Sequence, residues 1–146
     1  MIGPADLLLL AERWIDAGTE GEWRSAVSRA YYAAFHEARR LLRQLGLEVP
    51  RGEGAHAYLS LRLSNCGTPS LQDAGYTLIS LRRERNRADY DIDRTMRRSD
   101  ARVQVVAARS TVGALAVALP IADRSSLVDA IRRYETDVLR EPTWHN

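Results

Sequence analysis

The sequence contains no lysine, so all 21 of its basic residues are arginines. Its 19 acidic residues nearly balance them, and the net charge of +2 is too small to indicate a nucleic-acid-binding protein by itself. A genome rich in G and C would explain the bias toward arginine. Its chemical consequence is the same in either case, because a guanidinium keeps its charge and can bind phosphate or carboxylate through two parallel hydrogen bonds.

Cysteine is almost absent, and the single Cys66 excludes an intrachain disulfide and a cysteine-based zinc cluster. The three histidines, His36, His56 and His145, lack the spacing of metal ligands, so we expect no metal site and no other cofactor. No apolar run is long enough to span a bilayer, and the first residues do not resemble a signal peptide. These absences favour a cytoplasmic protein that has no association with a membrane.

The remaining composition, 45% hydrophobic and 27% charged, is that of an ordinary globular protein. A length of 146 residues predicts a single domain over residues 1–146, with about 141–146 as a loose C-terminal tail. Apolar residues recur with a period of 3.6, which predicts an all-α fold, an antiparallel bundle of four to five main helices plus a short helix. The expected helices cover about residues 4–17, 22–45, 53–63, 70 onward, 100–119 and 126–139.

The end of the fourth expected helix carries charge on its apolar side. Its stripe of Leu78 and Leu81 continues into Arg85 and then Asp89, which is four residues later and can pair with Arg85 on a helix. A buried guanidinium must be paired or border a cavity, because leaving it dry and unmatched would cost several kcal/mol. The two residues therefore form either a structural ion pair at a place where two helices meet or part of an anion-binding cleft, and composition does not decide between these readings.

The second expected helix has a polar face opposite its apolar stripe. At 100° per residue this face occupies an arc of about 80°. Its members are Ser25, Arg29, Tyr32, His36, Arg40 and Arg43. Such a face is either an ordinary solvated surface or a site that combines an imidazole, a phenol and guanidinium groups. Tyr31 falls on the apolar side and is expected in the core.

Two segments together resemble the signature of the HEPN domain family, in the branch of small prokaryotic proteins. They are "RSAVSRAYYAAFHEARRLL" from Arg24 to Leu42 and "RNRADYD" from Arg85 to Asp91, an RxxADY-type motif about fifty residues later. The resemblance implies a helical homodimer whose two motifs meet at a shared arginine cleft. It also implies a metal-independent endoribonuclease, often a toxin of a toxin–antitoxin or defence system, whose partner is a nucleotidyltransferase-like antitoxin.

The family motif is an arginine followed by a histidine, and its residues transfer onto this sequence with one departure. Arg85 matches the arginine and Asn86 the polar residue after it, but Tyr90 occupies the histidine position. The implied catalytic residues are Arg85, Asn86, Asp89 and Tyr90, and the implied RNA- or phosphate-binding residues are Arg82, Arg29, Tyr32 and His36. The implied product carries a 2′,3′-cyclic phosphate.

The tyrosine matters because a phenol with an ordinary pKa of about 10 is a poor base at neutral pH, whereas histidine is a good one. Either Tyr90 donates a proton or orients the 2′-hydroxyl, or His36 supplies the imidazole. Two alternatives to a ribonuclease stay open. One is a non-catalytic module that binds RNA, a nucleotide or a partner protein, and the other is a structural bundle whose arginines form internal ion pairs.

Overall fold

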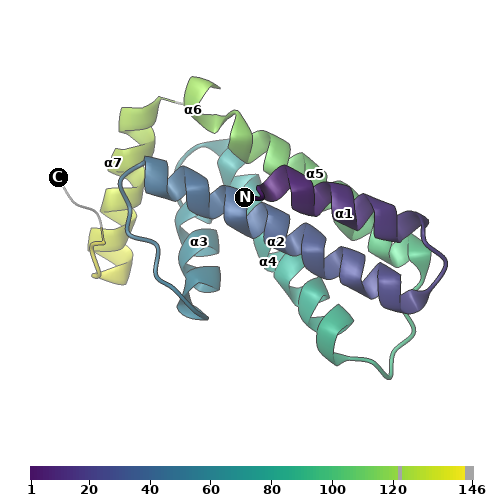
Figure 1. Ribbon diagram of the computed structural model, residues 1–146. Helices are drawn as coiled ribbons and strands as arrows, with labels where there is room; N and C mark the ends of the chain where they lie inside the picture. The colour runs from purple at the N-terminus through teal and green to yellow at the C-terminus, as the bar shows by residue number, and fades with distance from the viewer. Residues whose placement is uncertain (122, 144–146) are drawn as a thin grey trace. The chain divides into compact units, whose positions relative to one another are not determined.

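The computed structural model describes residues 1–121 and 123–143, and all of its regular elements are helices (Figure 1). They are α1 (Pro4–Asp16), α2 (Glu20–Gln44), α3 (Gly54–Ser64), α4 (Pro69–Tyr90), α5 (Arg98–Ala116), α6 (Ala118–Ile121), α7 (Arg124–Tyr134) and a π-helical turn, η1 (Glu135–Leu139). The predicted all-α fold is confirmed. Among the helices that the structure describes, none combines the length and apolar character that a membrane span requires.

The helix ends differ from the predictions in three places. The helix expected from about residue 100 begins at Arg98 in α5, and the carboxylate of Asp100 accepts a hydrogen bond from the N–H of Arg97 at 3.0 Å. The expected helix over 100–119 is interrupted at Val117, between α5 and α6. The last helix begins earlier than expected because Asp123 caps it, accepting the N–H of Ser125 at 3.0 Å.

The chain divides into two compact units, and three helices contribute residues to both. The first unit combines Met1–His36 with Thr77–Val112, and the second combines Glu37–Tyr76 with the described residues from Gly113 onward. The boundaries fall within α2, α4 and α5. The single domain expected over residues 1–146 stays a prediction.

The first unit is built around small residues of α2. The hydroxyl of Thr19 accepts the N–H of Glu22 at 3.3 Å and so marks the start of α2, antiparallel to α1 across a short connection. The buried side chains of this unit include Leu8, Ala11, Ile15, Ala26, Val27, Ala30, Tyr31, Ala34, Leu78, Leu81, Ala88, Ala101, Val105 and Ala108. The small alanine side chains of α2 let neighbouring helices pack close to its backbone. The larger side chains of α2 are therefore held near those helices. The core position predicted for Tyr31 is confirmed.

The second unit contains a buried ion pair. Arg62 of α3 and Glu135 of η1 are 4% and 0% exposed, and Arg62 Nη2 lies 2.9 Å from Glu135 Oε2. Glu135 also accepts hydrogen bonds from the N–H and hydroxyl of Thr143, so this residue of the expected loose tail is anchored. Residues 144–146 of that tail lie outside the described residues. At Gly75 of α4 a Cβ would come 2.5 Å from the nitrogen of Ser64, so α3 and α4 touch here only because the side chain is absent.

Candidate functional site

Arg85 lies on the packed side of α4, as predicted, and its charge is only partly compensated. It is 7% exposed, and its Nη1 lies 3.7 Å from Asp89 Oδ2, which is an ion-pair distance rather than a hydrogen bond. Its buried Nε has no hydrogen-bond partner among the described residues. The guanidinium carbon lies 5.5 Å and 5.4 Å from the ring centroids of Tyr31 and Tyr32 on α2. Arg85 is therefore held by rings and one long ion pair and keeps a donor free.

Asp89 connects α4 to α2 without closing the site. Its carboxylate accepts a hydrogen bond from the buried Ser28 hydroxyl at 3.3 Å, and its side chain is 32% exposed. The predicted Arg85–Asp89 pair is confirmed. It is the geometry that the structural reading requires, but the side chain of Asp89 is partly exposed, so the pair is not sealed from solvent on that side. The geometry is thus compatible with both readings of the charged helix end.

The other two expected catalytic residues lie on a different face of α4. Tyr90 is 74% exposed and Asn86 is also exposed. Five residues separate Arg85 from Tyr90, which places them about 140° apart around a helix. Asn86 and Tyr90 line a surface depression of about 400 Å³ together with Ile79, Arg82, Arg83, Arg87 and Asp91, which we call the α4 depression. The structure therefore splits the expected catalytic set into the ion pair of the buried Arg85 with the partly exposed Asp89, and the two exposed residues Asn86 and Tyr90.

Three members of the polar arc of α2 come together at a second hollow. Arg29, Tyr32 and His36 line it with Ile2, Gly3, Pro4 and Leu7, and its volume is about 520 Å³; we call it the α1–α2 pocket. The Arg29 guanidinium carbon is 5.2 Å from the Tyr32 ring centroid, and the Tyr32 and His36 rings lie 6.3 Å apart at 36°. The arc is thus more than a solvated surface at these residues. Arg40, in contrast, pairs with Glu37.

The ring of Tyr32 connects the two groups of residues. Its centroid is 5.2 Å from the guanidinium carbon of Arg29 and 5.4 Å from that of Arg85. Both guanidinium groups therefore lie near the ring of Tyr32, which lines the α1–α2 pocket, whereas Arg85 itself does not line it. All three residues belong to the first unit.

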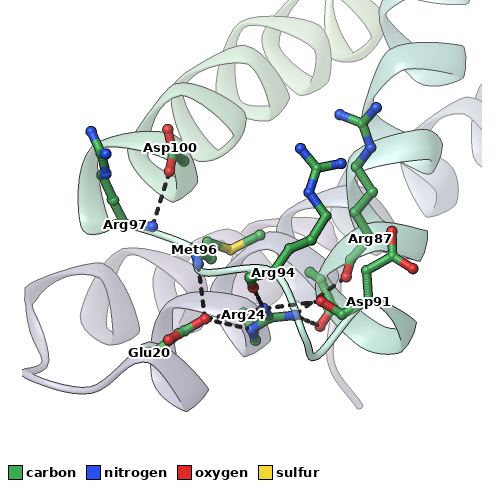
Figure 2. Close-up of polar contacts among 9 residues, drawn as sticks. Glu20, Arg24, Arg87, Asp91, Arg94, Met96, Arg97 and Asp100 are labelled. Atoms are coloured by element: carbon green, nitrogen blue, oxygen red, sulfur yellow. Dashed lines mark hydrogen bonds and ion pairs between the residues drawn. The ribbon is translucent and has the colours of Figure 1, made fainter.

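Sequence reasoning missed the role of Arg24, which holds the end of α4 in place (Figure 2). Its guanidinium donates hydrogen bonds to the backbone carbonyls of Arg87, Ala88, Asp91 and Arg94. Glu20 accepts from the same guanidinium at 3.0 Å and from the N–H of Met96 at 2.8 Å. In the sequence, the four-residue spacing of Glu20 and Arg24 indicates that these two side chains can pair on a helix. The backbone carbonyls that Arg24 contacts have no counterpart in the sequence pattern.

The N–H of Met96, and then the guanidinium of Arg24, hold the pKa of the Glu20 carboxyl below its ordinary value. The same corner encloses a hollow of about 330 Å³ that Arg24, Arg87 and Arg94 line. Glu84, Asp91 and Asp100 line it as well, so its charges are mixed. In Figure 2 the side chains of Arg87 and Arg94 extend to the same side of the segment that follows α4.

Among the described residues, no group of three or more histidine, cysteine, aspartate or glutamate side chains is placed to hold a metal ion. The two histidines that the structure describes lie in different parts of the fold. His36 is exposed at the α1–α2 pocket, whereas His56 is buried in α3. His145 lies outside the described residues.

Comparison with known proteins gives one match. The family model of the HEPN domain matches residues 11–115, a range that includes Arg24, Arg29, Tyr32, Arg85 and Tyr90. Searches of curated proteins and of solved structures returned no significant match. The family model therefore covers the residues of the site, whereas Ile2, Gly3, Pro4 and Leu7 of the α1–α2 pocket precede its matched range.

Proposed function

The chain belongs to the HEPN domain family, and we propose that it binds single-stranded RNA along α2 and α4 and cleaves it without a metal ion. The observation that carries this proposal is the state of Arg85. A guanidinium that is 7% exposed, has an unbonded Nε and has only a 3.7 Å ion pair is poorly compensated for a purely structural group. An RNA phosphate would supply the missing acceptor.

The reaction needs few groups from the protein. Attack of a ribose 2′-hydroxyl on the adjacent phosphate builds negative charge on the phosphorane oxygens, and a guanidinium held in a partly dry site stabilises that charge. The 2′-hydroxyl gives its proton to a base as the 2′-oxygen bonds to phosphorus, the bond from phosphorus to the 5′-oxygen breaks, and that oxygen takes a proton from an acid. The product carries a 2′,3′-cyclic phosphate. Arg85 supplies the charge in this proposal, and Asp89 fixes the orientation of Arg85.

Two residues are candidates for the group that transfers the proton, His36 on α2 and Tyr90 on the exposed face of α4. His36 lies beside Tyr32, whose ring contacts Arg85, whereas Tyr90 lies on the exposed face. An imidazole also titrates near neutral pH, which an unperturbed phenol does not. These facts support His36 over Tyr90 as the acid or base for a phosphate bound at Arg85 of the same chain.

The exposed face of α4 is the surface we assign to a second copy of the chain. Ile79 and Tyr90 are 48% and 74% exposed on it, and large apolar side chains exposed together are typical of contact surfaces. A homodimer through this face would place arginines of both copies, Arg82 among them, along one RNA. As in the family's toxin–antitoxin systems, a nucleotidyltransferase-like antitoxin would be the partner that restrains the activity.

The test is cleavage, in EDTA, of a structured RNA that contains single-stranded loops, by wild type, Arg85→Gln and Arg102→Gln. Arg102 is exposed on α5 and serves as the matched control, because its substitution removes the same charge outside the site. We expect metal-free cleavage by wild type and by Arg102→Gln and none by Arg85→Gln, with unchanged circular dichroism. Equal cleavage by wild type and Arg85→Gln would remove Arg85 from the mechanism.

The second candidate is a non-catalytic RNA-binding module, and the position of Tyr90 favours it. This residue replaces the family's histidine and does not share a face with Arg85, so the usual arginine–histidine combination is lost within one chain. The same experiment separates the two functions, since a binder retards RNA on a gel without cutting it. Binding by either function should weaken steeply as salt rises, because phosphate contacts release counterions.

A further inference from the structure

The α1–α2 pocket has a composition that suits a nucleobase better than a phosphate alone. Pro4 and Leu7 of α1 supply apolar surface on one side, and Tyr32 and His36 of α2 supply aromatic rings. A volume of about 520 Å³ is within the usual range for small-molecule sites. Proteins that hold single-stranded RNA combine such aromatic surfaces, on which bases stack, with guanidinium groups that contact the backbone.

Charge distinguishes this pocket from the hollow beside Arg24. Three carboxylates line that hollow, and Arg24 already donates to four carbonyls and Glu20, so its charge is largely satisfied. The described lining of the α1–α2 pocket contains Arg29 and no acidic side chain. At the Gly3 end, the carboxylate of Asp6 accepts a hydrogen bond from the N–H of Gly3 at 2.7 Å. A phosphate is therefore favoured at the Arg29 end and disfavoured at the Gly3 end.

The position of Tyr32 determines the orientation in which a base with its phosphate would bind in the pocket. Its ring contacts Arg29 and Arg85 at similar distances, 5.2 Å and 5.4 Å. Resting on the function proposed above, we propose that the α1–α2 pocket binds one unpaired base of the RNA, stacked against Tyr32 and His36 and covered by Pro4 and Leu7. The phosphate next to that base then reaches the arginines at Tyr32. The pocket is thus a positioning subsite that selects which phosphate meets Arg85.

The experiment measures binding of a fluorescein-labelled, single-stranded 2′-O-methyl oligoribonucleotide, which has no free 2′-hydroxyl and cannot be cleaved by this route. A set of these oligonucleotides carries one abasic position each, moved along the sequence. Leu7→Trp fills the pocket. Leu9→Trp is its matched control on the same helix, because Leu9 is 55% exposed and does not line the pocket.

For wild type and Leu9→Trp, we expect one abasic position to weaken binding about 5- to 150-fold, the range of a lost base–aromatic stack. Leu7→Trp should bind the intact oligonucleotide weakly by about the same factor and should show no further loss at any abasic position. His36→Ala, a change at an exposed side chain, should reduce the abasic effect without unfolding the protein. A flat abasic profile in wild type, or intact binding by Leu7→Trp equal to wild type, would overturn the inference.

Two further arms separate the possible failures. If wild type retains none of the oligonucleotides at low salt, the proposed RNA function fails together with the pocket. If wild type binds and Arg85→Gln does not, but the abasic profile is flat, only the base subsite fails. Adenosine monophosphate at millimolar concentration should leave the oligonucleotide bound, and displacement at micromolar concentration would instead identify the pocket as a site for free nucleotides.

Discussion

Replacing Arg85 with methionine should leave the stability of the protein almost unchanged, although the side chain is buried. The lost contacts are an ion pair to a half-open carboxylate, about 0.5–1 kcal/mol, and two ring contacts of about 0.5–1 kcal/mol each. Against this loss of about 1.5–3 kcal/mol stands the cost of burying an incompletely bonded guanidinium, which is several kcal/mol. The apolar thioether also keeps contact with the two rings.

The two sums nearly cancel, so we expect Arg85→Met to lie within about 1 kcal/mol of wild type, a change of at most about 4 °C in Tm. Arg62→Met is the matched comparison, because Arg62 is equally buried but is paired at 2.9 Å with a carboxylate that is 0% exposed. It should lose about 3–5 kcal/mol, since the buried Glu135 carboxylate would keep its charge and its hydrogen bonds from Thr143 but would lose its cationic partner. Urea denaturation followed by far-ultraviolet circular dichroism measures both.

A loss of 3 kcal/mol or more in Arg85→Met would refute the reasoning. It would show that the Arg85–Asp89 pair stabilises the packing of α4 against α2, as the structural reading holds. It would also show that burying Arg85 Nε without a hydrogen bond does not reduce the free energy of unfolding. Similar losses of stability in Arg85→Met and Arg62→Met would also refute the reasoning. They would show that the long ion pair of Arg85 and the close ion pair of Arg62 contribute equally to stability.

Two other predictions concern titratable groups. The pKa of Glu20 is lowered, so its contribution to stability is present above its ordinary value of 4.5 and disappears as pH falls through the lower folded value. The Tm difference between wild type and Glu20→Gln should therefore shrink below pH 4.5, and a difference independent of pH would contradict the role of the carboxylate. Burial raises the pKa of the Cys66 thiol, which is 2% exposed. Native protein should react with a disulfide reagent at pH 8 far more slowly than protein in urea, and equal rates would show that Cys66 is accessible.

The sequence was sufficient for those features that depend on local pattern. The 3.6 period located α2 and α4 well, and α2 ends at Gln44, one residue before the expected end and close to Gly46, whose φ is +90°. The period also placed Tyr31 and Arg85 on packed faces. Applied one step further, it would have shown that Tyr90 lies about 140° from Arg85 and that the two do not share a face.

Features that depend on distant contacts left no such signal. Arg24 meets carbonyls more than sixty residues away, and Arg62 meets Glu135 across 73 residues. Every residue has a backbone carbonyl, so the residue types in the sequence do not indicate which carbonyls Arg24 contacts. The α1–α2 pocket was missed for a related reason, because Pro4 and Leu7 read as an ordinary helix start until α1 is placed against Tyr32.

The replacement of the family's histidine by Tyr90 takes a different meaning once the faces of α4 are known. Within one chain, the aromatic groups that meet Arg85 come from α2, so the tyrosine does not substitute for an imidazole beside that guanidinium. Tyr90 can act on a phosphate at Arg85 only across a second copy or along an RNA that covers both faces. Under the proposed function, chemistry confined to one chain would therefore use α2, where the ring of Tyr32 lies near Arg85 and the imidazole of His36 lies beside that ring.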